Sequence, residues 1–194
     1  MKKTKLRLTF NAPVVLGFAA LCLVVLIAGL ISKGASTRLL FSTYRSSLLN
    51  PLTYVRFLTH VAGHSGWEHF LGNMAYILLL GPMLEEKYGS LKLLIMMAIC
   101  AVITGVINYI LFPNISLCGA SGIVFAFILL TSITSFREGE IPLTFILVAV
   151  IYLGQQVYQA IFVRDNVSNL SHIIGGIVGG GFGYLMNRKP KKKE

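Results

Sequence analysis

Long uncharged hydrophobic runs alternate along this chain with short polar or basic segments. The runs are residues 8–32, 70–84, 93–136, 141–163 and 166–187. A membrane-spanning helix takes about 20 predominantly apolar residues, and Pro113 and Asn114 interrupt the longest run. The pattern therefore predicts six transmembrane helices, at about 12–32, 67–86, 91–112, 121–136, 141–163 and 169–187.

The composition agrees with a membrane protein. Hydrophobic residues make up 55% of the 194 residues and charged residues only 12%, which is too apolar for an ordinary soluble domain of this size. We expect an all-α polytopic membrane protein with a six-helix domain at residues 12–187, in which a long outer loop covers about 36–68. Basic segments at residues 1–11 and 188–194 flank this domain.

The net charge of +10 comes largely from lysines and arginines at the two ends of the chain. Such basic flanks mark the cytoplasmic side of a membrane protein and contact the lipid bilayer. We therefore expect both termini in the cytoplasm, which requires an even number of crossings and agrees with six. No aromatic residues are interleaved with the charge, so we expect no nucleic-acid partner. Four cations run against this topology because they fall in the outer loop: Lys33, Arg38, Arg45 and Arg56.

The first hydrophobic run also begins with the basic residues that are typical of a signal peptide. Its apolar core, residues 13–31, is longer than the usual core of such a peptide. No clear small-residue cleavage motif follows it. We therefore expect this segment to remain in the protein as its first membrane-spanning helix.

A small-residue turn, Cys-Gly-Ala-Ser-Gly at residues 118–122, lies within the longest uncharged run. Because the break at Pro113 ends one helix before this turn, Ser121 falls at or near the N-terminus of the next. Free N–H groups and the positive end of the helix dipole favour negative charge there, so Ser121 is a candidate nucleophile. Cys118 is a weaker candidate because its position relative to the helix terminus is less favourable. The three cysteines are too scattered to form a disulfide framework or a metal site.

Polar residues gather at the start of the second predicted transmembrane helix. His69 and Asn73 are four residues apart and therefore share one helical face, so both side chains can reach a common point. His60 and His64 precede them. An unpaired imidazole or amide is costly in lipid, so each must face protein or water. Hydrogen bonding between helices would explain either residue alone.

The last predicted helix combines a histidine with regularly spaced glycines. Gly175, Gly179 and Gly183 repeat every four residues and form a smooth face on which another helix can approach closely. His172 lies near the outer end of that face. If the partner is the helix that begins at Ser121, the imidazole comes within hydrogen-bonding distance of the serine. Without that serine, the pattern would indicate only a glycine-mediated helix contact.

Together these residues predict a Ser–His hydrolase. His172 would take the proton of Ser121 as its hydroxyl attacks a carbonyl, and would later give it to the leaving amine. His69, Asn73 and the Ser121 N–H would donate hydrogen bonds to the oxyanion. No Asp or Glu lies within the uncharged runs to orient the histidine, so we expect a dyad. This chemistry needs neither a metal nor another cofactor.

The motifs resemble those of the rhomboid intramembrane serine proteases. That family has a histidine five residues before a His-x-x-x-Asn motif, a Gly-x-Ser-Gly motif opening the fourth helix, and a histidine followed by spaced glycines on the sixth. The corresponding residues here are His64, His69 with Asn73, Gly119-Ala120-Ser121-Gly122, and His172 with Gly175, Gly179 and Gly183. The resemblance covers residues 12–187.

The resemblance implies catalytic roles for Ser121 and His172 and an oxyanion hole from His69, Asn73 and the Ser121 N–H. It also implies supporting roles for a second set of residues: His64, Gly119, Gly122, Phe125 and Gly175. Substrates would be single-pass membrane proteins that enter laterally between the second and fifth helices. A compact chain of this kind suits the bacterial plasma membrane. The resemblance does not name the natural substrate or the oligomeric state.

Two positions depart from the family pattern. Val55-Arg56 stands where many members have Trp-Arg, and Phe125 stands where a tyrosine is common. Neither change removes a reacting group, and the ring of Phe125 can still pack on His172. Two alternatives remain: a catalytically silent rhomboid-like binding protein, and a small transporter that uses the polar residues of its interior.

Overall fold

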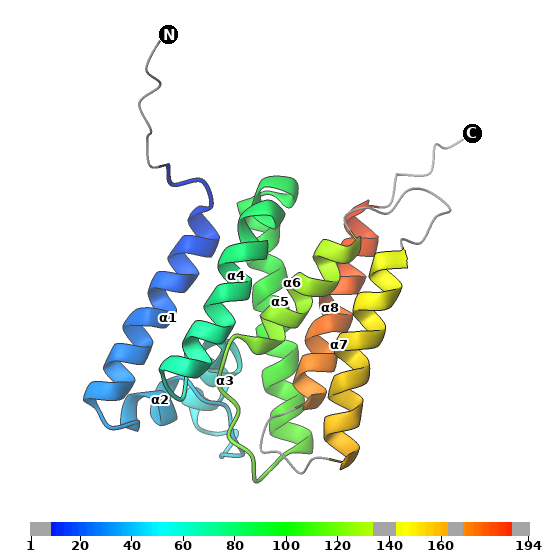
Figure 1. Ribbon diagram of the computed structural model, residues 1–194. Helices are drawn as coiled ribbons and strands as arrows, with labels where there is room; N and C mark the ends of the chain where they lie inside the picture. Colours follow the sequence, from blue (N-terminus) through cyan, green and yellow to red (C-terminus); the bar gives the residue numbers. More distant parts are fainter. Residues whose placement is uncertain (1–8, 134–142, 163–168, 188–194) are drawn as a thin grey trace.

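The computed structural model describes residues 9–133, 143–162 and 169–187, and this part of the chain is built from helices (Figure 1). Six long helices stand side by side, while two short helices and a 3₁₀ turn lie between the first and second of them. The elements in order are α1 (Pro13–Ile31), α2 (Ala35–Leu40), α3 (Pro51–Thr59), η1 (His60–Ala62), α4 (Trp67–Tyr88), α5 (Ser90–Leu111), α6 (Ser121–Ile133), α7 (Leu143–Phe162) and α8 (Asn169–Asn187). The six long helices correspond to the six predicted hydrophobic segments.

Two of the described helices, α1 and α5, are long and apolar enough by themselves to cross a membrane, and α6 is a shorter apolar helix. A helix of 22 residues, the length of α4 and α5, is about 33 Å long and matches the hydrocarbon thickness of a bilayer. The start of α1 and the end of α8 lie at the same end of the bundle (Figure 1). The number of crossings and the side of each terminus stay predictions.

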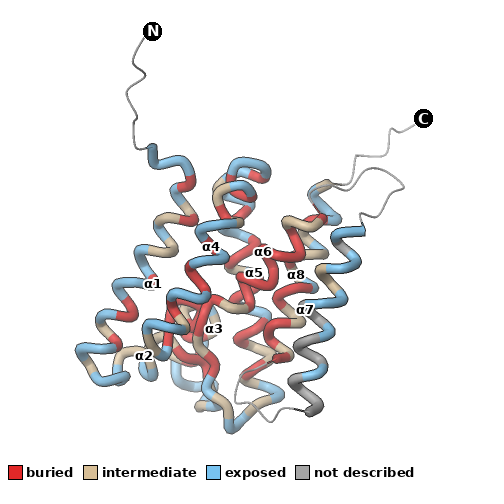
Figure 2. Tube along the Cα trace, in the orientation of Figure 1, coloured by how far each residue is buried: buried red, intermediate tan, exposed pale blue. Residues whose placement is uncertain are grey.

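Helix α6 lies at the centre of the bundle. It contacts α4, α5, α7 and α8, and its residues are buried along almost its whole length (Figure 2). Its sequence, SGIVFAFILLTSI, has no charged side chain, and its only polar side chains are small hydroxyl groups. The helix can therefore be surrounded by other helices on every side. The helix begins partway along the bundle, where the segment from α5 reaches it (Figure 1). The start of α6 is therefore inside the protein.

The glycines of α8 bring its backbone directly against α6. A Cβ atom on Gly175 would overlap the backbone of Gly122, and one on Gly179 would overlap the backbone of Ala126. This is the close helix approach that the four-residue glycine spacing predicts. The helices α6 and α8 accordingly form the most extensive helix contact in the described part of the chain.

The predicted outer loop is ordered and contains α2, α3 and η1. Arg56, one of the four cations that ran against the expected topology, is buried and donates from Nε to the Leu39 carbonyl oxygen at 2.7 Å. Its guanidinium also lies 4.6 Å from the centre of the Tyr44 ring. The arginine therefore holds the loop together from within, whereas the neighbouring Val55 is exposed.

A buried carboxylate joins α4 to the start of α1. Glu85 accepts hydrogen bonds from the backbone N–H groups of Val14 and Val15 at 3.0 Å each, and from the Ser90 hydroxyl at 2.6 Å. The carboxylate satisfies N–H groups that have no partner within α1, and its charge complements the helix dipole. Glu85 lies in the last turn of α4 and is only 4% exposed. Sequence spacing alone does not identify a partner 70 residues away.

The glycine contact generates the first prediction. Gly179→Ala should lower the free energy of unfolding by about 1–3 kcal/mol, because the added methyl group has to push α8 away from the Ala126 carbonyl. Gly181→Ala on the same helix is the control, since no atom lies within 4 Å of its added Cβ. Thermal unfolding in detergent measures both. Equal losses for the two variants would contradict the contact.

The cap on α1 generates the second prediction. Glu85→Gln should lower the free energy of unfolding by about 1–3 kcal/mol, because the amide loses the charge and turns an NH₂ group toward a backbone N–H group. Glu86→Gln is the matched control, because Glu86 is the adjacent residue and is exposed. The same thermal unfolding measurement applies. A loss of stability confined to the Glu86 variant would refute the cap.

Candidate active site

Ser121 is the first residue of α6, and the segment before it is tied to the outer loop. Leu117 and Thr43 exchange two backbone hydrogen bonds of 2.9 Å in an isolated antiparallel bridge. Two residues later, the Gly119 N–H donates to the His60 carbonyl oxygen at 2.9 Å. Gly119 has φ of +122°, a conformation that favours glycine. These contacts fix the turn that presents Ser121, whose side chain is half-buried.

His172 lies in the first turn of α8 and reaches the serine directly. Its Nε2 atom is 2.8 Å from the Ser121 Oγ, a hydrogen-bonding distance. One turn further along α8, Gly175 packs on the Gly122 backbone, so the close approach of the two helices sets this distance. The structure therefore brings together a hydroxyl and an imidazole that are 51 residues apart in the sequence.

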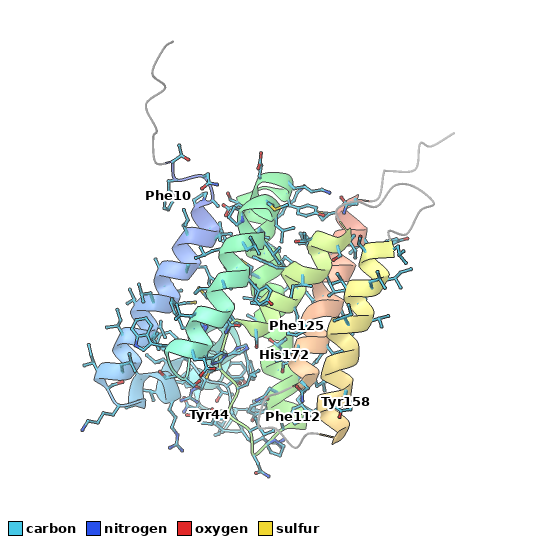
Figure 3. All side chains as sticks on the ribbon, viewed as in Figure 1. Phe10, Tyr44, Phe112, Phe125, Tyr158 and His172 are labelled. Atoms are coloured by element: carbon cyan, nitrogen blue, oxygen red, sulfur yellow. The ribbon has the colours of Figure 1, made fainter. Side chains whose placement is uncertain are left out.

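The Phe125 ring fixes the plane of the imidazole. The two rings are stacked, with centroids 4.7 Å apart and an interplanar angle of 6° (Figure 3). Phe125 is one turn after Ser121 on α6, so a single helix supplies the hydroxyl and the surface that holds its imidazole partner. This confirms the expectation that the phenylalanine ring can pack on His172.

His69 and Asn73 meet at the turn before the serine, as their shared helical face predicts. A Cβ atom on Gly119 would lie 2.6 Å from His69 Nε2 and 3.6 Å from Asn73 Nδ2. Only a residue without a side chain leaves room for both groups here. Asn73 Nδ2 is buried and has no hydrogen-bond partner. This buried amide beside the serine turn is therefore free of protein acceptors and is a candidate donor to a group bound there.

His64 supports this group from the loop before α4. Its ring packs edge-on against His69, with 5.1 Å between centroids, and its Nδ1 atom lies 3.2 Å from the Ala62 carbonyl oxygen. Burial, followed by the nearby His69, lowers the pKa of His64 to about 4, so its imidazole is neutral near pH 7. His64 therefore acts as a packing surface without a charge.

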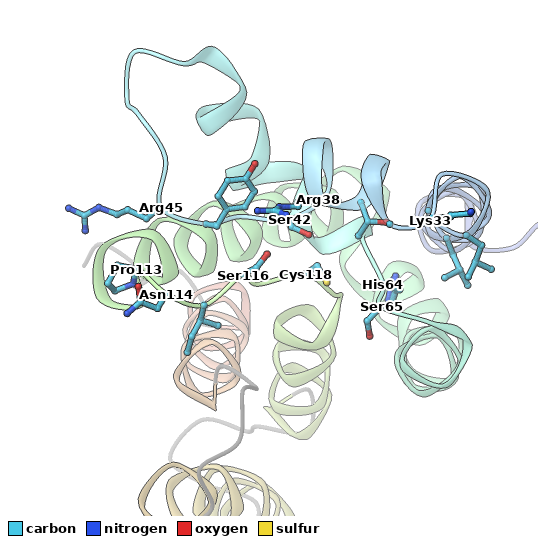
Figure 4. A pocket seen from close by; sticks show the side chains of 17 residues that line it. Lys33, Arg38, Ser42, Arg45, His64, Ser65, Pro113, Asn114, Ser116 and Cys118 are labelled. Carbon is cyan, nitrogen blue, oxygen red and sulfur yellow. The ribbon is translucent and has the colours of Figure 1, made fainter.

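Cys118, the alternative nucleophile, faces a different space. Its half-buried thiol lines a cavity of about 700 Å³ between the outer loop and residues 113–118, whose lining includes neither Ser121 nor His172 (Figure 4). Burial raises the pKa of the Cys118 thiol, although a hydrogen bond with Ser42 opposes the shift. A raised pKa disfavours the reactive thiolate. The geometry thus favours Ser121.

The described residues offer neither a cluster of metal ligands nor a carboxylate on α6 or α8 that could orient His172. Within residues 9–133, 143–162 and 169–187, no three His, Cys, Asp or Glu side chains are grouped as metal ligands. The sequences of α6 and α8 contain no Asp or Glu. The amino-acid pattern does not reveal the roles of Thr43 and of the His60 carbonyl oxygen, because both act through the backbone.

The chain also matches a known protein family. The rhomboid domain matches residues 51–189, which is more than half of the chain. The chain belongs to the rhomboid family. The matched region begins with α3 and includes Ser121, His172, His69 and Asn73, whereas Thr43 precedes it. This confirms the resemblance on which the sequence interpretation depended.

Several curated proteins are similar to this rhomboid chain. Rhomboid-related protein 2 of Mus musculus is 32% identical over 160 residues, covering 72% of this chain and 53% of the mouse protein. Rhomboid protease GlpG of Haemophilus influenzae is 26% identical over 140 residues, covering 70% of this chain and 71% of that protein. Rhomboid protease GluP of Bacillus subtilis is 29% identical over 166 residues, covering 82% and 31%. The chain thus spans about half the length of the mouse protein and about a third of the Bacillus protein.

Proposed function

We propose that this rhomboid-family chain is an intramembrane serine endopeptidase whose catalytic dyad is Ser121 and His172. The observation that carries the proposal is the 2.8 Å distance between Ser121 Oγ and His172 Nε2 at the buried start of α6. Two bacterial relatives that are named rhomboid proteases support the reaction class. The helix N-terminus adds favourable electrostatics for charge that develops beside the serine.

The reaction follows from this pair. Ser121 Oγ forms a bond to the carbonyl carbon of the substrate while His172 Nε2 accepts the hydroxyl proton. The tetrahedral intermediate collapses, the C–N bond breaks, and His172 returns the proton to the leaving amine. Water then attacks the acyl-serine ester with His172 again as the base. This second step releases the carboxylate product and restores the hydroxyl of Ser121.

His69, Asn73 and the Ser121 N–H are the proposed oxyanion donors. The unpartnered Asn73 Nδ2 and the His69 Nε2 both lie next to Gly119, two residues before the nucleophile. A carbonyl oxygen held there would satisfy the buried amide and gain further stabilisation as its charge grows. The Gly119 N–H is already bonded to the His60 carbonyl, so it holds the turn in place and is not assigned to the oxyanion hole.

The supporting residues act on the geometry of these groups. Phe125 orients the imidazole by stacking, and His64 packs on His69. Gly119 leaves room for the oxyanion donors, whereas Gly175 lets α8 approach the backbone of Gly122 on α6. The proposed mechanism uses these residues and needs no metal or other cofactor.

The proposed substrates are single-pass membrane proteins, cut in or near their transmembrane segments. The long apolar helices α1 and α5 support a location in the bilayer. In this proposal residues 12–187 form one six-helix membrane domain between basic cytoplasmic ends at 1–11 and 188–194. A bacterial plasma membrane is the proposed location, and two relatives from bacteria support it, although a mouse relative is also similar.

The dyad generates the third prediction. Ser121→Ala and His172→Ala should each reduce cleavage of a transmembrane substrate in liposomes by about 1000-fold or more, because each removes a group that acts in the bond-breaking steps. Cys118→Ala is the control and should keep its activity. Labelling with a fluorophosphonate should require Ser121. Unchanged cleavage by the Ser121 variant would exclude this mechanism. A wild type that neither cleaves nor becomes labelled would instead favour a silent binding protein or a transporter.

The oxyanion donors generate the fourth prediction. Asn73→Ala should lower kcat by about 10- to 1000-fold with little change in KM, because the amide stabilises charge that appears only in the transition state. Gly72→Ala is the matched control, since it adds a methyl group one residue away on α4 with no atom within 4 Å. Steady-state cleavage kinetics give both constants. A rise in KM at constant kcat would assign Asn73 to substrate binding instead.

A further inference from the structure

A hydroxyl outside the predicted motifs contacts one of the proposed oxyanion donors. Ser65 Oγ lies 3.1 Å from His69 Nδ1, just before α4 begins at Trp67. Ser65 and the neighbouring His64 lie together on one wall of the large outer cavity (Figure 4). The family motifs include His64 and His69 but leave Ser65 unassigned.

The two nitrogens of His69 have different surroundings. The Nε2 and Cε1 atoms face Gly119 and the serine turn, whereas Nδ1 faces the Ser65 hydroxyl. A neutral imidazole carries its proton on only one nitrogen, and the other nitrogen is an acceptor. If Nε2 is to donate to an oxyanion, Nδ1 has to accept a hydrogen bond. A serine hydroxyl can rotate to supply the proton for that bond.

We propose that Ser65 is a positioning residue that donates to His69 Nδ1 and so keeps the proton of His69 on Nε2, toward the oxyanion. This inference rests on the proposed peptidase function, since the oxyanion exists only in that reaction. His64 and Ser65 act on the His69 imidazole in two different ways. The His64 ring, 5.1 Å away at an interplanar angle of 64°, limits the tilt of the His69 ring, and Ser65 selects its tautomer.

A hydrogen bond in the opposite direction, from His69 Nδ1 to Ser65, would remove one donor from the oxyanion hole. With the proton on Nδ1, His69 would donate to Ser65 and turn the lone pair of Nε2 toward the developing negative charge. The oxyanion would then keep only two of its three proposed donors. Ser65 therefore matters through its influence on His69, without contacting the substrate.

The size of the effect follows from the exposure of the contact. Ser65 is exposed, so water can replace part of the hydrogen bond when the hydroxyl is removed. Ser65→Ala should therefore lower kcat by about 3- to 10-fold, the rate equivalent of one hydrogen bond, with KM unchanged. Ser65→Thr keeps the hydroxyl and should restore most of the rate. Ser116→Ala is the matched control, because Ser116 lines the same cavity and should keep the wild-type rate.

A double-mutant cycle tests whether Ser65 acts through His69. In a His69→Ala background, Ser65→Ala should cause no further loss of substrate cleavage or of fluorophosphonate labelling. Independent and multiplicative losses would overturn the proposal. So would an Ala variant of Ser65 with the full wild-type kcat.

Nitrogen NMR of the intact protein with labelled histidine reads the tautomer directly, using His69→Ala to assign the signals. The wild type should show an unprotonated His69 Nδ1, and Ser65→Ala should shift the population toward protonated Nδ1. A wild type with its proton on Nδ1 would overturn the proposal even if cleavage is normal. If the wild type has no peptidase activity, the proposed function fails, but the NMR measurement still decides whether Ser65 sets the tautomer.

Discussion

The close contact between the backbones of α6 and α8 is the constraint on which the rest of the site depends. Gly175 and Gly179 leave no side chain between the helices, and the helix that carries His172 therefore meets the helix that carries Ser121. Lipid provides little hydrophobic drive for helices to associate, so close packing has to supply the attraction. The same packing that stabilises the centre of the bundle thus sets the distance between the two candidate reacting groups.

A second constraint is the polar backbone that leads into α6. Irregular backbone is tolerated at membrane depth only where protein or water satisfies its hydrogen bonds. Here the outer loop provides partners through Thr43 and the His60 carbonyl oxygen. Asn108 adds a side-chain donor to the Ile115 carbonyl oxygen at 3.1 Å. The loop is therefore part of the support for Ser121, as well as a connection between helices.

Sequence patterns predicted the helices and the pairing of Ser121 with His172, because both depend on local signals: uncharged runs, helical spacing and a glycine repeat. They did not predict the cap that Glu85 places on α1, the burial of Arg56 or the contact of Ser65 with His69. These features depend on partners that a periodic pattern does not identify. Ser65 is four residues before His69, but it precedes the helix, so helical spacing did not apply.

The parallel stack of Phe125 on His172 has a further consequence. In a Ser–His–Asp triad a carboxylate orients the imidazole, and that carboxylate loses its charge when it is protonated. An aromatic face has no proton to gain or lose, and the attraction between stacked rings is largely insensitive to salt. Phe125 therefore supports the imidazole with a ring that has no titrating group of its own.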